Sequence, residues 1–214
     1  MRITSRLVGK ISFSVMAVAL VLSLAGIGEC YYERYQAEKL LGTVAAIQVG
    51  STTKTQAKEM LKPYSRYSTL RYFDEASADE FDQYGFLNRT LAALHLATRT
   101  WVWITIDYKE GVVTSKSVQA ASEPRCSGSV AESLRNDIPS AVEQTDTGRT
   151  MGIDGSPGQP YFGVQVRDDL STPAVRRQLD WQIDLSCMTW RQGCTDPRKT
   201  LYGAFLPATS ERRK

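Results

Sequence analysis

The chain has few of the residues on which metal and catalytic chemistry usually depend. Its 214 residues include a single histidine, His95, and four cysteines with no Cys-x-x-Cys pair. Zinc sites draw on such pairs or on several histidines, so we expect no metal site. The four glycines of residues 148–158 are neither preceded by an apolar strand nor followed by Lys-Ser or Lys-Thr. A phosphate-binding loop is therefore not expected, and we predict no cofactor.

A basic face is also missing. The net charge is +3, and three of the 26 Lys and Arg residues (Arg2, Arg6 and Lys10) fall in the first 28 positions, which contain no acidic residue. Residues 29–214 therefore carry 23 cations and 23 anions. A nucleic-acid partner normally requires a cationic surface. The only basic cluster is the tail at residues 212–214, so we expect no nucleic-acid partner.

The feature that dominates the sequence is an uncharged apolar run, Ile11 to Gly28. As a helix it would span about 27 Å, close to the hydrocarbon thickness of a bilayer. Positive charge precedes the run and Glu29 follows it. The positive-inside tendency then predicts a cytoplasmic segment 1–10, a transmembrane signal-anchor 11–28 in the lipid bilayer, and an extracytoplasmic portion 29–214. In a Gram-negative cell this portion would be periplasmic.

Two other interpretations of the run stay open. Small residues at 25–28 leave cleavage as a signal peptide as an alternative, although signal-peptide cores are usually about 7–15 residues long. Lipid attachment at Cys30 is the second alternative, but Glu29 occupies the position where lipoproteins carry Gly or Ala.

In an exported chain an even number of cysteines favours disulfides. Cys187 and Cys194 lie closest together in the sequence. On one helix they would be about 10 Å apart, too far for a disulfide. A bridge between them therefore requires the helix to end, and Gly193 tolerates the left-handed conformation of such an end. The pairing of Cys30 and Cys126 stays open, including a bond between two chains.

The segments after the run predict two helices first. Apolar residues at three- and four-residue spacing extend the membrane helix to about Gly50. Thr53 and Gln56 form a capping-box pattern for a second helix, 54–62, which Pro63 closes. An aromatic-rich link at 64–73 and a polar turn at 74–80 follow.

The rest of the chain predicts an antiparallel sheet of about four strands. A strand region begins at Phe86 and continues through Leu91, Leu94 and Leu96, followed by a hairpin of 101–108 and 112–119 and a strand at 161–167. Residues 145–160 are expected to form a mobile loop, and a C-terminal helix is expected from Pro173 towards Trp190. The predicted fold class is α+β.

Two resemblances accompany this interpretation. The corner at residues 47–63 resembles the start of the BamE/SmpA-like envelope lipoproteins, although Lys62 stands where their pattern has Gly before Pro63. The chain is also similar to a group of uncharacterised single-pass bacterial membrane proteins with a C-terminal LxC…GC element. The similarity covers the membrane helix, the start of the strand at Phe86 and the ending around Cys187 and Cys194. That second resemblance implies no activity.

The expected function is a non-catalytic interaction or envelope-scaffold module anchored in the cell membrane. Its partner, for example another envelope protein, would contact the sheet near Trp101 and Trp103 or the loop 145–160. The alternative is an envelope hydrolase that uses His95 with a carboxylate such as Asp107, because general acid–base catalysis requires such a pair within hydrogen-bond reach.

Overall fold

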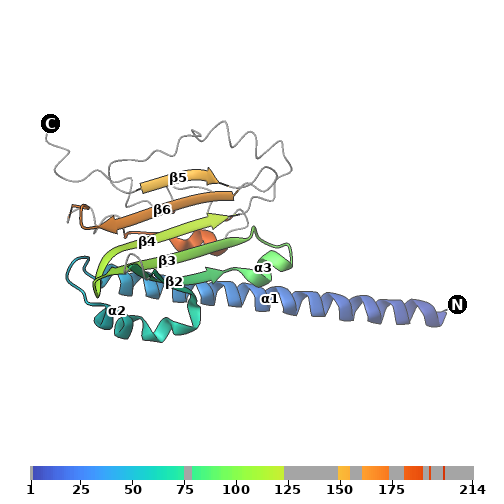
Figure 1. Ribbon diagram of the computed structural model, residues 1–214. Helices are drawn as coiled ribbons and strands as arrows, with labels where there is room; N and C mark the ends of the chain where they lie inside the picture. The colour runs from blue at the N-terminus through green and yellow to red at the C-terminus, as the bar shows by residue number, and fades with distance from the viewer. Residues whose placement is uncertain are drawn as a thin grey trace.

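The computed structural model describes residues 2–74, 79–122, 149–154, 161–173, 181–189, 193 and 200. A long helix lies beneath an antiparallel sheet and projects well beyond it at the N-terminus (Figure 1). The described part is α+β, as the sequence predicts. The sheet has six strands in the order β1-β2-β3-β4-β6-β5, rather than about four.

Helix α1, Arg2–Ala46, is a single unbroken helix of 45 residues. The extension of the apolar run into an amphipathic helix is therefore confirmed. Phe13–Ala46 is long and apolar enough to cross a membrane, on length and composition alone. In its C-terminal part, residues at three- and four-residue spacing are buried at 0–6% exposure, namely Ala37, Leu40, Leu41 and Val44. This face packs against the sheet.

The corner after α1 is stabilised by the hairpin below it. Gly50 adopts a φ of +85°, which favours glycine, and its N–H donates to the Val113 carbonyl at 2.8 Å. Helix α2, Lys54–Leu61, begins with the expected capping box between Thr53 and Gln56. Helix α2 ends at Leu61, and the chain continues directly as the 3-10 helix η1, Lys62–Tyr67.

The sheet is built of β1 (Ser68–Asp74), β2 (Asp79–Leu87), β3 (Thr100–Lys109), β4 (Val112–Ser122), β5 (Arg149–Asp154) and β6 (Tyr161–Asp169). The predicted hairpin is confirmed as β3 and β4, and the predicted strand at 161–167 as β6. Glu110 and Gly111 both have positive φ, as a two-residue type I′ turn requires. Strands β1 and β5 were not predicted, and they form the two edges of the sheet.

The prediction of a strand through Leu91, Leu94 and Leu96 is wrong. Strand β2 ends at Leu87 and helix α3, Arg89–Ala93, follows it. The physical reason is Asn88: its amide donates to the Thr98 carbonyl at 2.8 Å and accepts from the Thr100 N–H at 2.8 Å. These bonds close a loop between β2 and β3, which takes residues 89–99 out of the sheet.

Three further predictions need correction or lie outside the described residues. The polar turn expected at 74–80 is narrower, because Asp79 already belongs to β2, and residues 75–78 are not described. The loop expected at 145–160 contains β5, which pairs with β6. Of the expected C-terminal helix, 174–180 lie outside the described residues, and Leu185–Thr189 form the 3-10 helix η2.

The C-terminal end of α1 is held to the sheet by a buried lysine. Lys116 of β4 is 3% exposed, and its Nζ donates to the carbonyls of Val44, Ala45 and Ile47 at 2.9–3.1 Å. At the end of a helix the last carbonyls lack an N–H four residues further on, so the ammonium group supplies them with a donor and complements the negative end of the helix dipole. The ammonium also lies 4.6 Å from the Trp181 ring.

Candidate functional site: a cleft at the edge of strand β2

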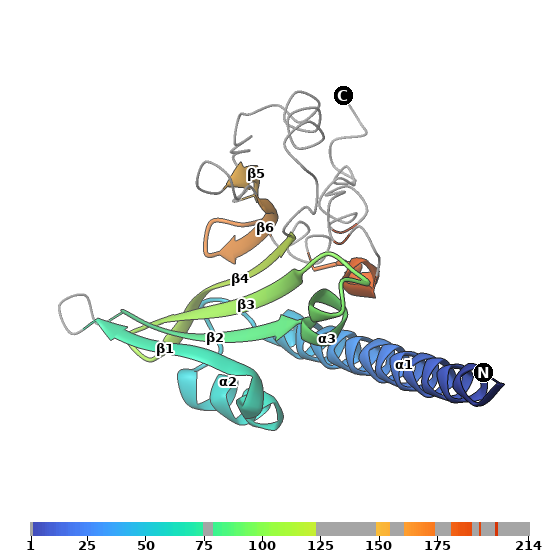
Figure 2. The same ribbon diagram turned by 90° about the vertical axis from the view of Figure 1, so that its right-hand side faces the viewer.

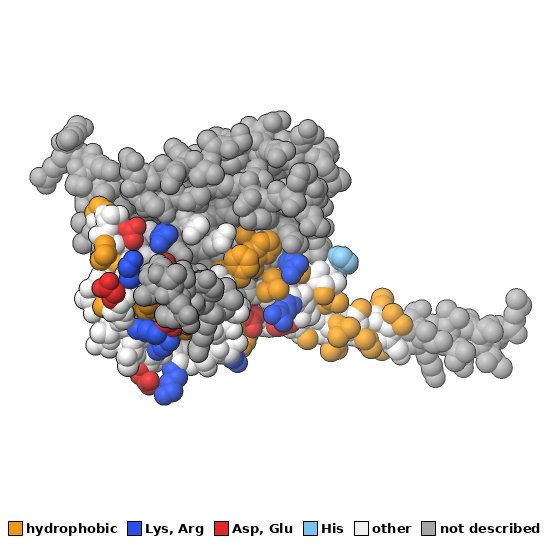
Figure 3. Space-filling model, viewed as in Figure 1, with side chains coloured by type: hydrophobic (Ala, Val, Ile, Leu, Met, Phe, Trp, Pro, Cys, Tyr) orange, Lys and Arg blue, Asp and Glu red, His pale blue; other side chains and the backbone are white. Residues whose placement is uncertain are grey.

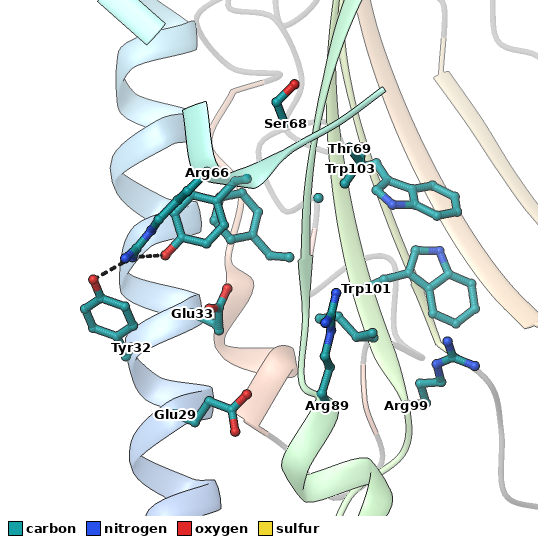
Figure 4. Close-up of a pocket in the computed structure, with 14 residues that line it drawn as sticks. Glu29, Tyr32, Glu33, Arg66, Ser68, Thr69, Arg89, Arg99, Trp101 and Trp103 are labelled. Atoms are coloured by element: carbon teal, nitrogen blue, oxygen red, sulfur yellow. Dashed lines mark hydrogen bonds between the residues drawn. The ribbon is translucent and has the colours of Figure 1, made fainter. Parts of the chain in front are cut away.

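A cleft of about 720 Å³ surrounds the exposed edge of β2. We call it the β2-edge cleft. It begins one residue after the apolar run, at Glu29, and draws its lining from α1, η1, β1, β2, β3 and the two ends of the α3 loop (Figure 4). The lining residues are Glu29, Tyr32, Glu33, Arg66, Tyr67, Ser68, Thr69, Gly85, Phe86, Leu87, Arg89, Arg99, Trp101 and Trp103.

The cleft exists because β1 is shorter than the strand beside it. The pairing of β1 with β2 begins at Ser68 and Tyr84, and its register shifts immediately afterwards. Residues 85–87 of β2 therefore pair with β3 on one side and with no described strand on the other. A short stretch of sheet edge opens into the cleft at this point, with the Thr69 side chain packed over Gly85.

The aromatic part of the cleft comes from the alternation of strand β3. Val102 and Ile104 point into the core, so Trp101 and Trp103 project from the opposite face and are half-buried. Their rings are 5.8 Å apart and inclined at 45°. Figure 4 shows both indoles on the side of the β2 edge away from α1. The structure thus places these two predicted contact residues in one cleft.

The charged part of the cleft faces α1. The Arg66 guanidinium donates to the Tyr32 hydroxyl at 2.6 Å and to the Tyr67 hydroxyl (Figure 4). Burial raises the pKa of Glu33, and the cation of Arg66 opposes that rise. A carboxylate and a guanidinium at one wall are suited to bind a partner that carries both signs of charge.

Two exposed arginines and one carboxylate lie at the other end of the cleft. Arg89 and Arg99 flank the loop that Asn88 closes, so both are held at the same end of the sheet. Glu29 accepts a hydrogen bond from the Thr90 hydroxyl, which fixes α3 against α1. Figure 3 shows blue and red side chains beside a hydrophobic patch near the point where α1 leaves the folded body.

The proposed catalytic pair is not assembled. His95 is exposed in the turn after α3, with a φ of 60°, and is not among the cleft residues. Asp107 lies seven residues along β3 from Thr100, about 23 Å away at the usual rise of a strand. Its carboxylate accepts from Ser115 and from Arg167. Within the described residues, no group of three or more His, Cys, Asp and Glu is arranged to hold a metal ion.

The cysteine predictions have different outcomes. Cys30 is a free thiol at 2% exposure, and it donates to the Met188 carbonyl at 3.0 Å. Burial raises the pKa of this thiol to about 11, so it is protonated and unreactive at neutral pH. A bond from Cys30 to another chain has no access in this structure. The Cys187–Cys194 bridge stays a prediction, because Cys194 lies outside the described residues; Gly193 does adopt the expected left-handed φ, +70°.

Comparison with known proteins adds no assignment: no family model, curated protein or solved structure matches this chain. Both resemblances stay untested for that reason. The two tryptophans were predicted from the sequence, whereas the charged residues of the cleft, Glu29, Glu33, Arg66, Arg89 and Arg99, were not. They come from three segments that are far apart in the sequence, and only the fold brings them together. The break in periodicity at Asn88 was the one local signal that could have located the loop carrying two of them.

Proposed function

We propose that this chain is a membrane-anchored, non-enzymatic interaction module, with residues 1–10 in the cytoplasm and 29–214 outside, whose β2-edge cleft binds a segment of another envelope protein. The observation that carries the proposal is the composition of the cleft. Half of its fourteen lining residues are Trp, Tyr or Arg, the three residue types most enriched among the residues that dominate binding energy at protein interfaces.

Charge and geometry favour a protein partner over a polyanion. The cleft contains two carboxylates and three guanidinium groups, so it offers charges of both signs, whereas a polyanion site requires a mainly cationic surface. The sheet edge at residues 85–87 also offers backbone groups to an extended chain, as in recognition by strand addition. The two indoles beside that edge supply apolar area with little loss of side-chain entropy.

Site-specific photocross-linking in intact membranes tests this function. A benzophenone amino acid replaces Thr69, which is exposed and lines the cleft, and in a matched control it replaces Ser51, which is exposed at the corner after α1. We expect a discrete protein adduct from Thr69 alone. The adduct should disappear when the Trp101→Ala and Trp103→Ala substitutions are combined in the same chain.

Equal adducts from Thr69 and Ser51, or adducts from Thr69 that survive loss of both indoles, would refute binding in the cleft. The hydrolase alternative requires His95 to act with a carboxylate such as Asp107, and neither residue lines the β2-edge cleft. A His95→Ala variant that retains the Thr69 adduct is the outcome expected for a binding module.

A further inference from the structure

Helix α3 and the turn after it, residues 89–97, pack against helix α1 at the end of the apolar run. We call these residues the α3 segment. A methyl group added to Gly26 would come within 2.9 Å of the Thr90 methyl carbon, so the Thr90 side chain packs directly on α1 there. Cys30, Leu91 and Ala97 form a small buried cluster of their own, apart from the main core. The α3 segment therefore packs on α1 between Gly26 and Cys30.

That position straddles the end of the apolar run. Gly26 lies two residues before the end of the run at Gly28, which corresponds to about 3 Å inside its boundary at 1.5 Å per residue. The headgroup layer beyond the hydrocarbon is itself about 5–7 Å thick. With α1 inserted as an anchor, the α3 segment lies at the depth of that layer. Figures 1 and 2 both place α3 at the end of the sheet that faces the N-terminal half of α1.

The exposed side chains of the segment suit this depth. Residues 93–96 are exposed in succession, with Leu94 at 37% and Leu96 at 43%. Isolated exposed leucines are ordinary on soluble proteins. The stretch of α1 at the same level also carries exposed apolar side chains, Leu24 and Ile27 at 58% and 41%. Apolar side chains are thus exposed at this level on both the anchor and the folded domain.

Polar groups of the right kind border this surface. Arg89 at the start of the segment and Arg99, two residues beyond its end, are both exposed. Cations beside an apolar surface are attracted to lipid phosphates. On α1, exposed aromatic side chains begin just above the same level, at Tyr31, Tyr32 and Tyr35. Tyrosines concentrate in this way at membrane–water interfaces.

We propose that the α3 segment is a second membrane contact, with Leu94 and Leu96 in the outer interfacial layer of the bilayer and with Arg89 and Arg99 at the lipid phosphates. The proposal rests on the anchor role of α1 in the proposed function. Two contacts, one spanning and one interfacial, would fix the tilt of the sheet and hold the β2-edge cleft close to the headgroups.

Lipid photocross-linking of the full chain tests the contact. The chain is reconstituted in vesicles of phosphatidylethanolamine and phosphatidylglycerol with a benzophenone amino acid at Leu96, and lipid adducts are read by intact mass. Leu20, 61% exposed in the apolar run, is the positive control. Leu170, 65% exposed and packed near Gly50, is the negative control. Leu170 lies near the C-terminal end of α1, about 30 Å along the helix axis from the end of the apolar run.

We expect lipid adducts at Leu96 and Leu20 and none at Leu170. Adducts at Leu20 without adducts at Leu96 would overturn the second contact and leave the anchor intact. Absence of adducts at both Leu20 and Leu96 would overturn the anchor and with it the membrane part of the proposed function. Combining Arg89→Glu with Arg99→Glu should lower the Leu96 yield several-fold, and an unchanged yield would overturn the phosphate contacts.

Discussion

Leucines in the two halves of helix α1 have opposite surroundings. Leu24, in the N-terminal half, is 58% exposed, whereas Leu40, in the C-terminal half, is fully buried. The sheet and η2 cover the C-terminal half. In the N-terminal half, the described residues bury only 11% of the apolar stretch that could span a membrane. A run of exposed leucines, valines and isoleucines needs an apolar surrounding, and a bilayer supplies one.

We expect the largest loss of stability at Lys116, which links the C-terminal half of α1 to the sheet. Lys116→Met removes the donor to three carbonyls and also removes the cation opposite the fully buried Asp168 of β6. We expect the free energy of unfolding to fall by about 3–5 kcal/mol, measured by urea unfolding in detergent with tryptophan fluorescence. The exposed Lys62→Met should change it by less than about 0.5 kcal/mol. Similar effects from both variants would refute the fastening role.

The next prediction compares the two halves directly. Leu40→Ala should destabilise the domain by about 2–5 kcal/mol because it opens a cavity in the core. Leu24→Ala changes a side chain that the domain does not cover, so the same measurement should shift by less than about 0.5 kcal/mol. A large loss of domain stability in Leu24→Ala would mean that protein, rather than lipid, covers the N-terminal half.

A smaller effect is expected at the ion pairs between α2 and the sheet. Lys58 lies 3.0 Å from the Glu80 carboxylate, and Lys54 also donates to it, which lowers the pKa of Glu80. Glu80→Gln should cost about 1 kcal/mol at neutral pH, because these partly exposed pairs are screened by solvent.

The pH dependence of the Glu80→Gln variant tests the direction of the pKa shift of Glu80. A carboxylate with a lowered pKa stabilises the fold above its ordinary pKa, and this contribution is lost as the pH falls below about 4. The difference between wild type and Glu80→Gln should therefore shrink from pH 7 to pH 3. The more exposed Glu59→Gln, whose partner is Lys62, should show almost no difference at either pH. A gap that widens in acid would contradict the assignment of these pairs.

Local patterns predicted the parts of the fold that local interactions determine. The unbroken apolar helix, the Thr53 cap and the β3–β4 hairpin each follow from residues within a few positions of one another. Strands β1 and β5 form the edges of the sheet, and each pairs with the strand that follows it in the chain. They were missed because the turn-forming residues beside them indicated a link and a loop. The strand predicted through Leu94 and Leu96 failed because alternation in sequence resembles a strand, whereas the Asn88 side chain takes the backbone bonds that would have continued it.

The site was predictable only in part for the same reason. Alternation along β3 suffices to place Trp101 and Trp103 on one face of a strand. Nothing local places Arg66 beside Tyr32, which lies 34 residues earlier, because only the tertiary fold brings η1 against α1. The charged wall of the β2-edge cleft is therefore a property of the tertiary structure.

The most direct test of the account is the fate of residues 11–28 in the cell. Membranes from expressing cells are washed with alkaline carbonate, and the retained protein is extracted in detergent and weighed by intact mass. The account predicts an uncleaved chain of 23.8 kDa in the membrane fraction. A chain released by the wash, or one shortened at the small residues 25–28, would contradict the anchor and the interfacial contact that rests on it.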